Sequence, residues 1–300
     1  MIVQILLASA LSWWDMTPEV VREKINQRIM SVEAPAVEVG SVKNQVIKHD
    51  GRSTPIRIYT PENEQSFPVI VFIHGGAWVA GNLDTHDNLA RYLCANAQAV
   101  VVSVGYQNSP EGKFPGPLEQ CYDALLWTTQ HKNELHADTS RIAVVGDSAG
   151  GNMATALCMM VRDRQGPKID LQVLVNPAPD LTCGGTIDRQ NDTIDTLRWQ
   201  AAQYVARPND IHHPYVSPLI AKNLSFLPPA VVILAELDEL RQAGKQYAEK
   251  LQAANVPVQV YCQPGVGHLA GDGARASLRA QESLNFAISA LKQAFADRGN

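Results

Sequence analysis

The chain has 300 residues, of which 45% are hydrophobic, so it can bury a large core, and an α/β protein of this length often forms one domain. Its formal net charge is −5 and it has no cluster of lysine or arginine, which argues against a nucleic acid partner. No hydrophobic run is long enough to span a bilayer, so no membrane partner is expected.

The five cysteines lack the short spacings of metal-binding motifs, and most lie in apolar stretches. They are interpreted as reduced core residues of a cytoplasmic protein, namely Cys94, Cys121, Cys158, Cys183 and Cys262. The apolar start, Met1 to Leu11, contains Ala8-Ser9-Ala10, which is typical of a signal-peptide cleavage site, but no basic residue precedes it. A weak signal sequence therefore stays open as the alternative to a helix.

Residues 1–35 are predicted to be helical, with a second helix start at Thr17-Pro18, a capping residue followed by proline. The apolar stripe of this helix is formed by Val20, Val21, Ile25 and Ile29. The preceding pair, Trp13-Trp14, either covers the mouth of a pocket or simply packs on the core.

The next stretch changes to strand patterns. Residues 37–48 and 55–59 alternate apolar and polar side chains around His49-Asp50-Gly51, which predicts an antiparallel hairpin at a sheet edge. Residues 67–73 are continuously apolar, as in a strand buried on both faces. Further strands of the same sheet are predicted at residues 99–104, 142–145, 171–175, 230–235 and 258–261.

Helical patterns separate these strands, so the sequence predicts an α/β fold with a mostly parallel central sheet and helices on both faces, in a single domain over residues 1–300. The helices are marked by apolar positions near residues 89–93, 118–125, 243–251 and 284–295. Between Pro177 and Pro218 the strand pattern lapses into polar turns and a helical stretch around residues 193–204. An insertion of this length after a strand is typical of a lid.

The motif Gly146-Asp147-Ser148-Ala149-Gly150-Gly151 follows a strand and precedes a helix that ends before Gly166-Pro167. In a Gly-x-Ser-x-Gly turn of this kind, the serine adopts a strained backbone and the glycines let strand and helix approach. The hydroxyl is then exposed at the end of the sheet. Ser148 is therefore the candidate nucleophile.

The segment His74-Gly75-Gly76-Ala77 directly follows the buried strand 67–73. Glycines at this place let backbone N–H groups point at a developing negative charge, as acyl transfer requires. A further donor is expected from the residue after the nucleophile, Ala149. His74 is interpreted as a structural residue that holds the loop rather than as a base.

A serine nucleophile needs a base, and the base needs a carboxylate that fixes its tautomer, in the chain order serine, acid, histidine. His268 lies in a glycine-rich loop after the strand 258–261, whereas His212 and His213 lie in the lid-like insertion and are expected at the surface. Three carboxylates follow the strand 230–235, and their spacing does not choose among them: Glu236, Asp238 and Glu239.

The chain resembles the hormone-sensitive-lipase-like family of α/β-hydrolases, especially bacterial acetyl-esterase-like carboxylesterases. The resemblance covers residues 55–270 and is carried by motifs in the family order: His74 to Trp78, Gly81 to Asp87, Gly146 to Gly151, Ser217 to Leu219, Leu227 to Ala230, Leu237 to Arg241, and Gly267-His268.

The resemblance implies that Ser148 is the nucleophile, Asp238 the acid and His268 the base. It places the oxyanion donors in the loop Gly75 to Ala77, with Gly76 and Ala77 favoured, together with Ala149. It also implies a helical cap formed by residues 1–35 and 180–215.

The chain departs from the family pattern at three places. Ala77 replaces a third glycine, which is expected to matter little because the donor is backbone. Residues 105–111 lack the usual Asp-Tyr-Arg-Leu-Ala-Pro-Glu, and Leu269-Ala270 follows the histidine in place of Gly-Phe.

The expected function is hydrolysis of a small ester with a short acyl chain, through an acyl-enzyme on Ser148. One alternative is a receptor-like protein that binds a small ligand without turnover, although such proteins of this fold lack the histidine that is present here as His268. A second alternative is an amidase or peptidase with the same three residues. No metal or organic cofactor is expected, and a homodimer is left open.

Overall fold

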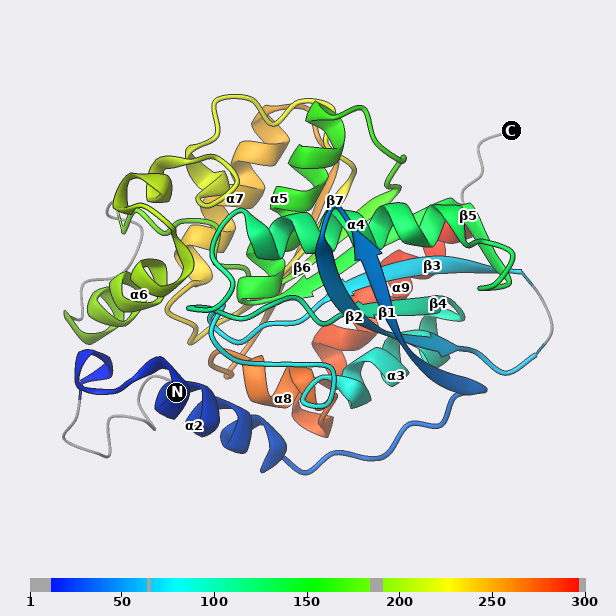
Figure 1. Cartoon of the computed structure of the whole chain (residues 1–300), viewed down its shortest axis with the longest axis horizontal. Helices are drawn as coiled ribbons and strands as arrows, with labels where there is room; N and C mark the ends of the chain where they lie inside the picture. Colours follow the sequence, from blue (N-terminus) through cyan, green and yellow to red (C-terminus); the bar gives the residue numbers. More distant parts are fainter. Residues whose placement is uncertain (1–11, 64–65, 184–190, 297–300) are drawn as a thin grey trace.

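The computed structural model describes residues 12–63, 66–183 and 191–296. Its centre is an eight-stranded sheet in the order β1-β2-β4-β3-β5-β6-β7-β8, with helices on both faces (Figure 1). All neighbouring pairs from β4 to β8 in this order are parallel. The predicted mostly parallel α/β sheet is therefore confirmed.

The predicted hairpin is present at one edge of the sheet. β1 (Ser41–His49) pairs antiparallel with β2 (Arg52–Thr60), which pairs antiparallel with β4 (Val100–Val104). Asp50 and Gly51 form the two-residue turn, with φ of 47° and 73°. Two successive left-handed residues match the twist of a tight hairpin, and this explains the Asp-Gly pair.

Apart from the edge strand β8, the parallel strands are largely buried because helices cover them on both sides. β3 (Phe67–Ile73) shows the alternation: Val69 and Val71 join one hydrophobic core, and Ile70 and Phe72 join the other. The remaining parallel strands are β5 (Ala137–Asp147), β6 (Leu171–Val175), β7 (Ala230–Ala235) and β8 (Val258–Gln263).

Among the described residues, five helices form the two outer layers, and the sequence predicts a helix at each of the five positions. α3 (Asp87–Ala97) and α9 (Gln281–Ala296) cover one face of the sheet. The opposite face is covered by α4 (Gly116–Gln130), α5 (Ala149–Asp163) and α7 (Arg241–Ala253).

The N-terminal segment contains a short 3-10 helix, Trp13–Asp15, and α2 (Pro18–Met30). Thr17 caps α2 by accepting a hydrogen bond from the Val20 N–H at 3.5 Å, as the Thr-Pro pair predicts. Val21, Ile25 and Ile29 are buried. The prediction for Val20 is wrong, since its side chain is 41% exposed and only one side of α2 contacts the protein.

The insertion after β6 contains α6 (Asn191–Tyr204) and two 3-10 helices, Pro208–His212 and Pro218–Ile220. α6 lies beside α2 beyond the ends of the parallel strands (Figure 1), and the Trp13 and Trp199 rings pack edge to face at 5.3 Å. Trp14, by contrast, is 55% exposed. Of the two interpretations of Trp13-Trp14, packing is therefore observed for Trp13.

Two short elements between β8 and α9 have no predicted counterpart: α8 (Ala270–Ala274) and a 3-10 helix, Leu278–Ala280. α8 contains two glycines in five residues, and glycine disfavours a helix by about 1 kcal/mol, so local propensity gives no signal for it.

The cysteines are free thiols, and three of them are buried as predicted: Cys94, Cys121 and Cys158. Cys183 is only partly buried, and Cys262 is exposed. The core prediction for Cys262 is wrong because β8 is the edge strand and turns alternate side chains to solvent. Within the described part of the chain, no helix is long and apolar enough to cross a membrane.

Candidate active site

Ser148 stands at a sharp turn between β5 and α5. Its φ is 53°, in the left-handed region that side chains rarely adopt, and its N–H donates to the Val175 carbonyl on β6 at 2.8 Å. A Cβ on Gly146 would collide with the Gly150 carbonyl, and one on Gly150 would collide with the Ile73 carbonyl. The two glycines therefore permit the close approach that the motif predicts.

Three side chains from separate loops meet at this turn. His268, from the loop after β8, places Nε2 at 2.9 Å from Ser148 Oγ and Nδ1 at 2.8 Å from Asp238 Oδ2. Asp238, from the loop after β7, is buried, and its Oδ1 accepts the Leu240 N–H at 3.0 Å. The arrangement is that of a serine nucleophile, a base and a carboxylate that orients the base.

The two other candidate acids lie elsewhere. Glu236 is exposed, and its carboxylate accepts the Gly265 N–H at 2.7 Å. Glu239 is half-buried, and none of the hydrogen bonds or ion pairs of the described residues joins it to His268. Asp238 is the carboxylate in contact with His268.

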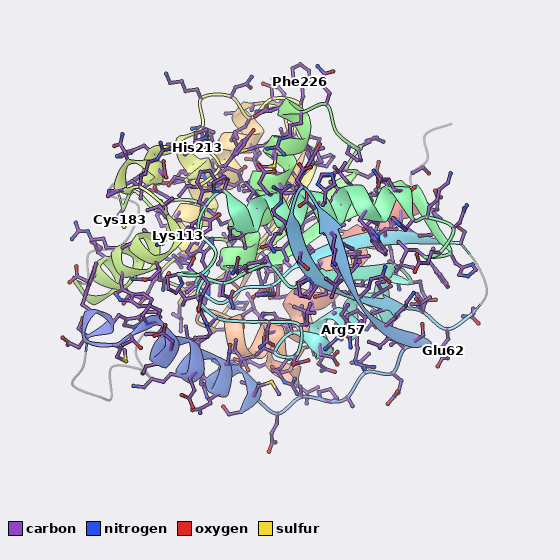
Figure 2. All side chains as sticks on the ribbon, in the orientation of Figure 1. Arg57, Glu62, Lys113, Cys183, His213 and Phe226 are labelled. Atoms are coloured by element: carbon purple, nitrogen blue, oxygen red, sulfur yellow. The ribbon has the colours of Figure 1, made fainter. Side chains whose placement is uncertain are left out.

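The histidines of the insertion are exposed, as expected. His213 lies on the segment after α6 (Figure 2), where its Nδ1 accepts the Tyr215 N–H at 3.1 Å and its ring lies 5.0 Å from Phe114. His212 ends a 3-10 helix at the surface. Among the hydrogen bonds of the described residues, none joins either of them to Ser148 or Asp238.

The predicted oxyanion loop follows β3 and faces the turn at Ser148, but its first N–H is occupied. Gly75 N–H donates to Asp147 Oδ1 at 2.9 Å, so Gly75 is wrong as an oxyanion donor. Among the hydrogen bonds of the described residues, none uses the N–H groups of Gly76, Ala77 or Ala149. These three remain the candidate donors.

Comparisons with known proteins agree with this geometry. A family model described as the alpha/beta hydrolase fold matches residues 70–271. The chain belongs to the α/β-hydrolase family. The sequence-based assignment to this family is thereby confirmed, and so is the predicted fold.

Several similar proteins are named as esterases. An arylesterase of Saccharolobus solfataricus is 34% identical, over 79% of this chain and 79% of its own. A carboxylesterase of Mycobacterium tuberculosis is 36% identical, over 84% of this chain and 82% of its own. The structure of a hyperthermophilic esterase from Pyrobaculum calidifontis superposes with a TM-score of 0.86 at 34% identity, covering 97% of this chain and 96% of that one. The predicted class, a carboxylic ester hydrolase, is confirmed.

The last residue of the predicted oxyanion loop and the residue after it both have strained backbones. Ala77 and Trp78 have φ of 57° and 61°, and a non-glycine residue in this region costs about 1–3 kcal/mol. The expectation that alanine in place of the third glycine matters little for a backbone donor stays a prediction, although position 77 adopts a conformation that favours glycine. The loop needs neighbours that hold it in place.

A buried polar chain lies behind the loop, and sequence reasoning assigned it no role. Asp147 Oδ2 lies 3.4 Å from His86 Nε2, and His86 Nδ1 lies 2.8 Å from Thr85 Oγ1. Burial opposes the charge of Asp147, but the His86 ring and the Gly75 N–H outweigh it, so the pKa of Asp147 is below its ordinary value. Thr85 and His86 belong to a motif of the resemblance, which was the available signal.

His74 has the structural role that its position predicts. Its ring is buried, stacks on Tyr106 at 4.2 Å between centroids, and places Nδ1 at 2.8 Å from the Gly75 carbonyl. Burial lowers the pKa of His74 to about 3, so it stays neutral over the working range of an esterase. Within residues 12–63, 66–183 and 191–296, no group of three or more His, Cys, Asp or Glu residues could hold a metal ion.

The charge state of His268 depends on two opposing effects. Burial disfavours the imidazolium, but the Asp238 carboxylate favours it more strongly, through both its charge and its hydrogen bond. The pKa of His268 is therefore raised above its ordinary value of 6.5. By contrast, burial lowers the pKa of His213 below that value.

This difference predicts the pH dependence of the hydrolase. A base must be neutral, so kcat/KM should fall as the pH drops through a pKa above 6.5, the ordinary value from which His268 is shifted upward. The measurement is kcat/KM against pH for a soluble ester. His212→Ala and His213→Ala should leave this limb in place, whereas a limb below 6.5 that His213→Ala removes would assign the base to the insertion.

Proposed function

We propose that this α/β hydrolase cleaves small esters with short acyl chains, with Ser148 as nucleophile, His268 as base and Asp238 as the acid that orients His268. The single observation that carries the proposal is the continuous contact from Asp238 Oδ2 through His268 to Ser148 Oγ, at 2.8 and 2.9 Å. A protein that only binds a ligand has no need of a base in contact with the serine.

The proposed reaction has two halves. His268 Nε2 takes the proton of Ser148 as Oγ attacks the ester carbonyl, and the resulting oxyanion accepts hydrogen bonds from N–H groups of Gly76, Ala77 and Ala149. The intermediate then expels the alcohol, which receives the proton from His268. Water, deprotonated by His268, attacks the acyl-enzyme in the same way and releases the carboxylic acid and free Ser148.

We also propose that residues 1–35 and 180–215 form a cap on a single domain that spans residues 1–300. Residues 1–11 and 184–190 of this cap lie outside the described residues. The described parts support it: Trp13 packs on Trp199, and Lys113 Nζ donates to the Gln203 carbonyl at 2.5 Å, at the end of α6 (Figure 2). This hydrogen bond of Lys113 connects the insertion with the loop before α4.

A closed cap predicts a sharp limit on acyl length. Each methylene that fits adds about 0.8 kcal/mol of binding, but the first one that does not fit must displace packed side chains at about 1–3 kcal/mol. Activity should hold or rise from two to about six acyl carbons and fall steeply beyond about eight, because the packed residues leave little room to adapt. The measurement is kcat/KM over a series of 4-nitrophenyl esters.

A matched anilide serves as the control for bond type. An amidase with the same residues would hydrolyse the anilide as well as the ester, whereas the proposed esterase should prefer the ester strongly. An optimum at about twelve carbons or more, beyond what a packed pocket admits, would contradict the closed cap. Absence of hydrolysis of every ester and anilide would favour the binding-protein alternative.

A further inference from the structure

α2 lies directly against the segment that follows the oxyanion loop. Its buried side joins a small hydrophobic cluster that is separate from the two main cores. Members of this cluster come from α2, from the turn after the oxyanion loop, from α6 and from α8, which begins two residues after His268 in the sequence: Val21, Ile25, Ile29, Val79, Ala80, Trp199 and Ala274. α2 therefore packs directly on the segments around the candidate active site.

Two polar side chains of α2 bond to the backbone of this turn. Arg22 Nε donates to the Val79 carbonyl at 2.6 Å, and Asn26 Oδ1 accepts the Gly81 N–H at 2.8 Å. Arg22 Nη2 also donates to the Ser109 carbonyl at 2.7 Å. Arg22 thus joins the turn 76–81 to a second loop, residues 108–111.

The backbone of the turn connects Arg22 to the oxyanion donor through two peptide groups. The peptide between Val79 and Ala80 receives the Arg22 hydrogen bond at its carbonyl, and its N–H donates to the Gly76 carbonyl at 2.8 Å. The Gly76 carbonyl belongs to the same planar peptide as the Ala77 N–H, one of the proposed oxyanion donors. Since a peptide is rigid and its N–H points away from its C=O, the orientation of the Ala77 N–H follows from these bonds.

The dipoles of these hydrogen bonds are also aligned, with their donors directed from Arg22 toward the proposed oxyanion position. The guanidinium cation faces a carbonyl oxygen, and each following N–H faces the next acceptor, so every donor points toward the oxyanion position. Hydrogen bonds aligned in this way strengthen one another. A positive charge at the far end therefore favours the Ala77 N–H as a donor.

The backbone at this turn needs contacts that hold its conformation, because Ala77 and Trp78 both have a positive φ. Such residues keep their conformation only where the surrounding structure determines it. The ion pair of Arg22 with Glu111, at 2.6 Å, is partly exposed on both sides, and ion pairs of this kind contribute little to stability by themselves. The contact with the Val79 carbonyl is therefore the one expected to matter for the site.

We propose that Arg22, assisted by Asn26, is a positioning residue that orients the Ala77 N–H of the oxyanion hole through the Val79–Ala80 peptide. The inference rests on the proposed function, since it gives Ala77 the role of donor. It adds to α2 a role in the chemical step that a cover alone does not have.

Arg22→Ala is the main test. Removal of a whole oxyanion donor lowers kcat by about 10²–10³, so loss of its support should lower kcat by about ten- to a hundredfold. KM should change by less than about twofold, and the loss should be equal for acetyl and hexanoyl esters, because an interaction made only in the transition state affects kcat alone. Arg22→Lys should recover part of kcat, since lysine still donates to one carbonyl.

Control variants separate this role from the ion pair and from general helix stability. Glu111→Gln removes the charge partner of Arg22, and Arg28→Ala removes an exposed basic side chain from the same helix. Both should keep kcat within about twofold, the scale of a weak surface interaction. Asn26→Ala should lower kcat, and Asn26→Asp should restore it because a carboxylate still accepts the Gly81 N–H.

Hydrogen exchange reads the same restraint without turnover. The amides of Val79 to Gly81 should exchange faster in Arg22→Ala than in the unmodified protein. In Arg28→Ala their exchange rates should be unchanged. Unchanged kcat and unchanged exchange in Arg22→Ala would overturn the inference, and so would a loss seen only in KM that grows with acyl length. If the unmodified protein hydrolysed no ester, the proposed function itself would fail, and the role of Arg22 in the oxyanion hole with it.

Discussion

Ser148→Ala is expected to lower kcat for ester hydrolysis by about 10⁴–10⁶, the loss typical of a removed nucleophile in a triad. Without Oγ there is no acyl-enzyme, and His268 keeps only the capacity to assist a direct attack by water. The measurement is turnover of a 4-nitrophenyl acetate at high enzyme concentration, together with circular dichroism to verify the fold.

The variant should remain folded because the serine side chain contributes little to the structure. The sharp turn depends on Gly146 and Gly150, and the one side-chain bond of Ser148 among the described residues is that to His268. Alanine has a Cβ like serine, so the cost of φ at 53° is present in both proteins. Loss of activity and loss of fold are therefore separable here.

Ser289→Ala is the matched control, the same replacement at an exposed position on α9. It should retain full activity and be labelled by a fluorophosphonate as the unmodified protein is, whereas Ser148→Ala should not be labelled. A folded Ser148→Ala protein with a tenth of the original activity, or one that still takes the label, would show that the nucleophile lies elsewhere.

The parts of this structure that the sequence predicts well are those fixed by local patterns. The strand at residues 67–73 is continuously apolar, and the structure buries it between two helical layers, each taking alternate side chains. The Gly-x-Ser-x-Gly turn is likewise local, because the collisions that require glycine occur between residues close to Ser148. In both cases a short stretch of sequence is enough to predict the local structure.

The parts that escaped prediction depend on contacts between distant segments. Gly75 looked like a donor because it lies in a glycine loop, but its N–H is bound by Asp147, 72 residues away. Arg22 and Val79 are 57 residues apart, and no sequence pattern indicates that an arginine beside the apolar stripe of a helix donates to a distant carbonyl. Edge position also explains the wrong interpretation of Cys262, since strand order is set by the whole sheet.

Asp238→Asn is expected to lower kcat by about 10⁴, by analogy with the acid of serine proteases. Asp238 Oδ2 lies 2.8 Å from His268 Nδ1, so the carboxylate holds the proton on Nδ1 and leaves the Nε2 lone pair facing Ser148. An asparagine that presents its NH₂ group would reverse the tautomer and place a proton on Nε2, where no base would then remain. The measurement is kcat for an acetyl ester beside the unmodified protein.

The neighbouring carboxylates provide the controls, and the pH dependence of the residual activity provides a second test of the role of Asp238. Glu236→Gln and Glu239→Gln should change kcat little, since glutamine at 236 can still accept the Gly265 N–H. In Asp238→Asn the burial of His268 persists without the carboxylate that outweighs it, so the acid limb of the residual activity should move to lower pH. A large loss confined to Glu236→Gln, with the limb unmoved in Asp238→Asn, would place the acid two residues earlier, and the contact seen between Asp238 and His268 would then be structural only.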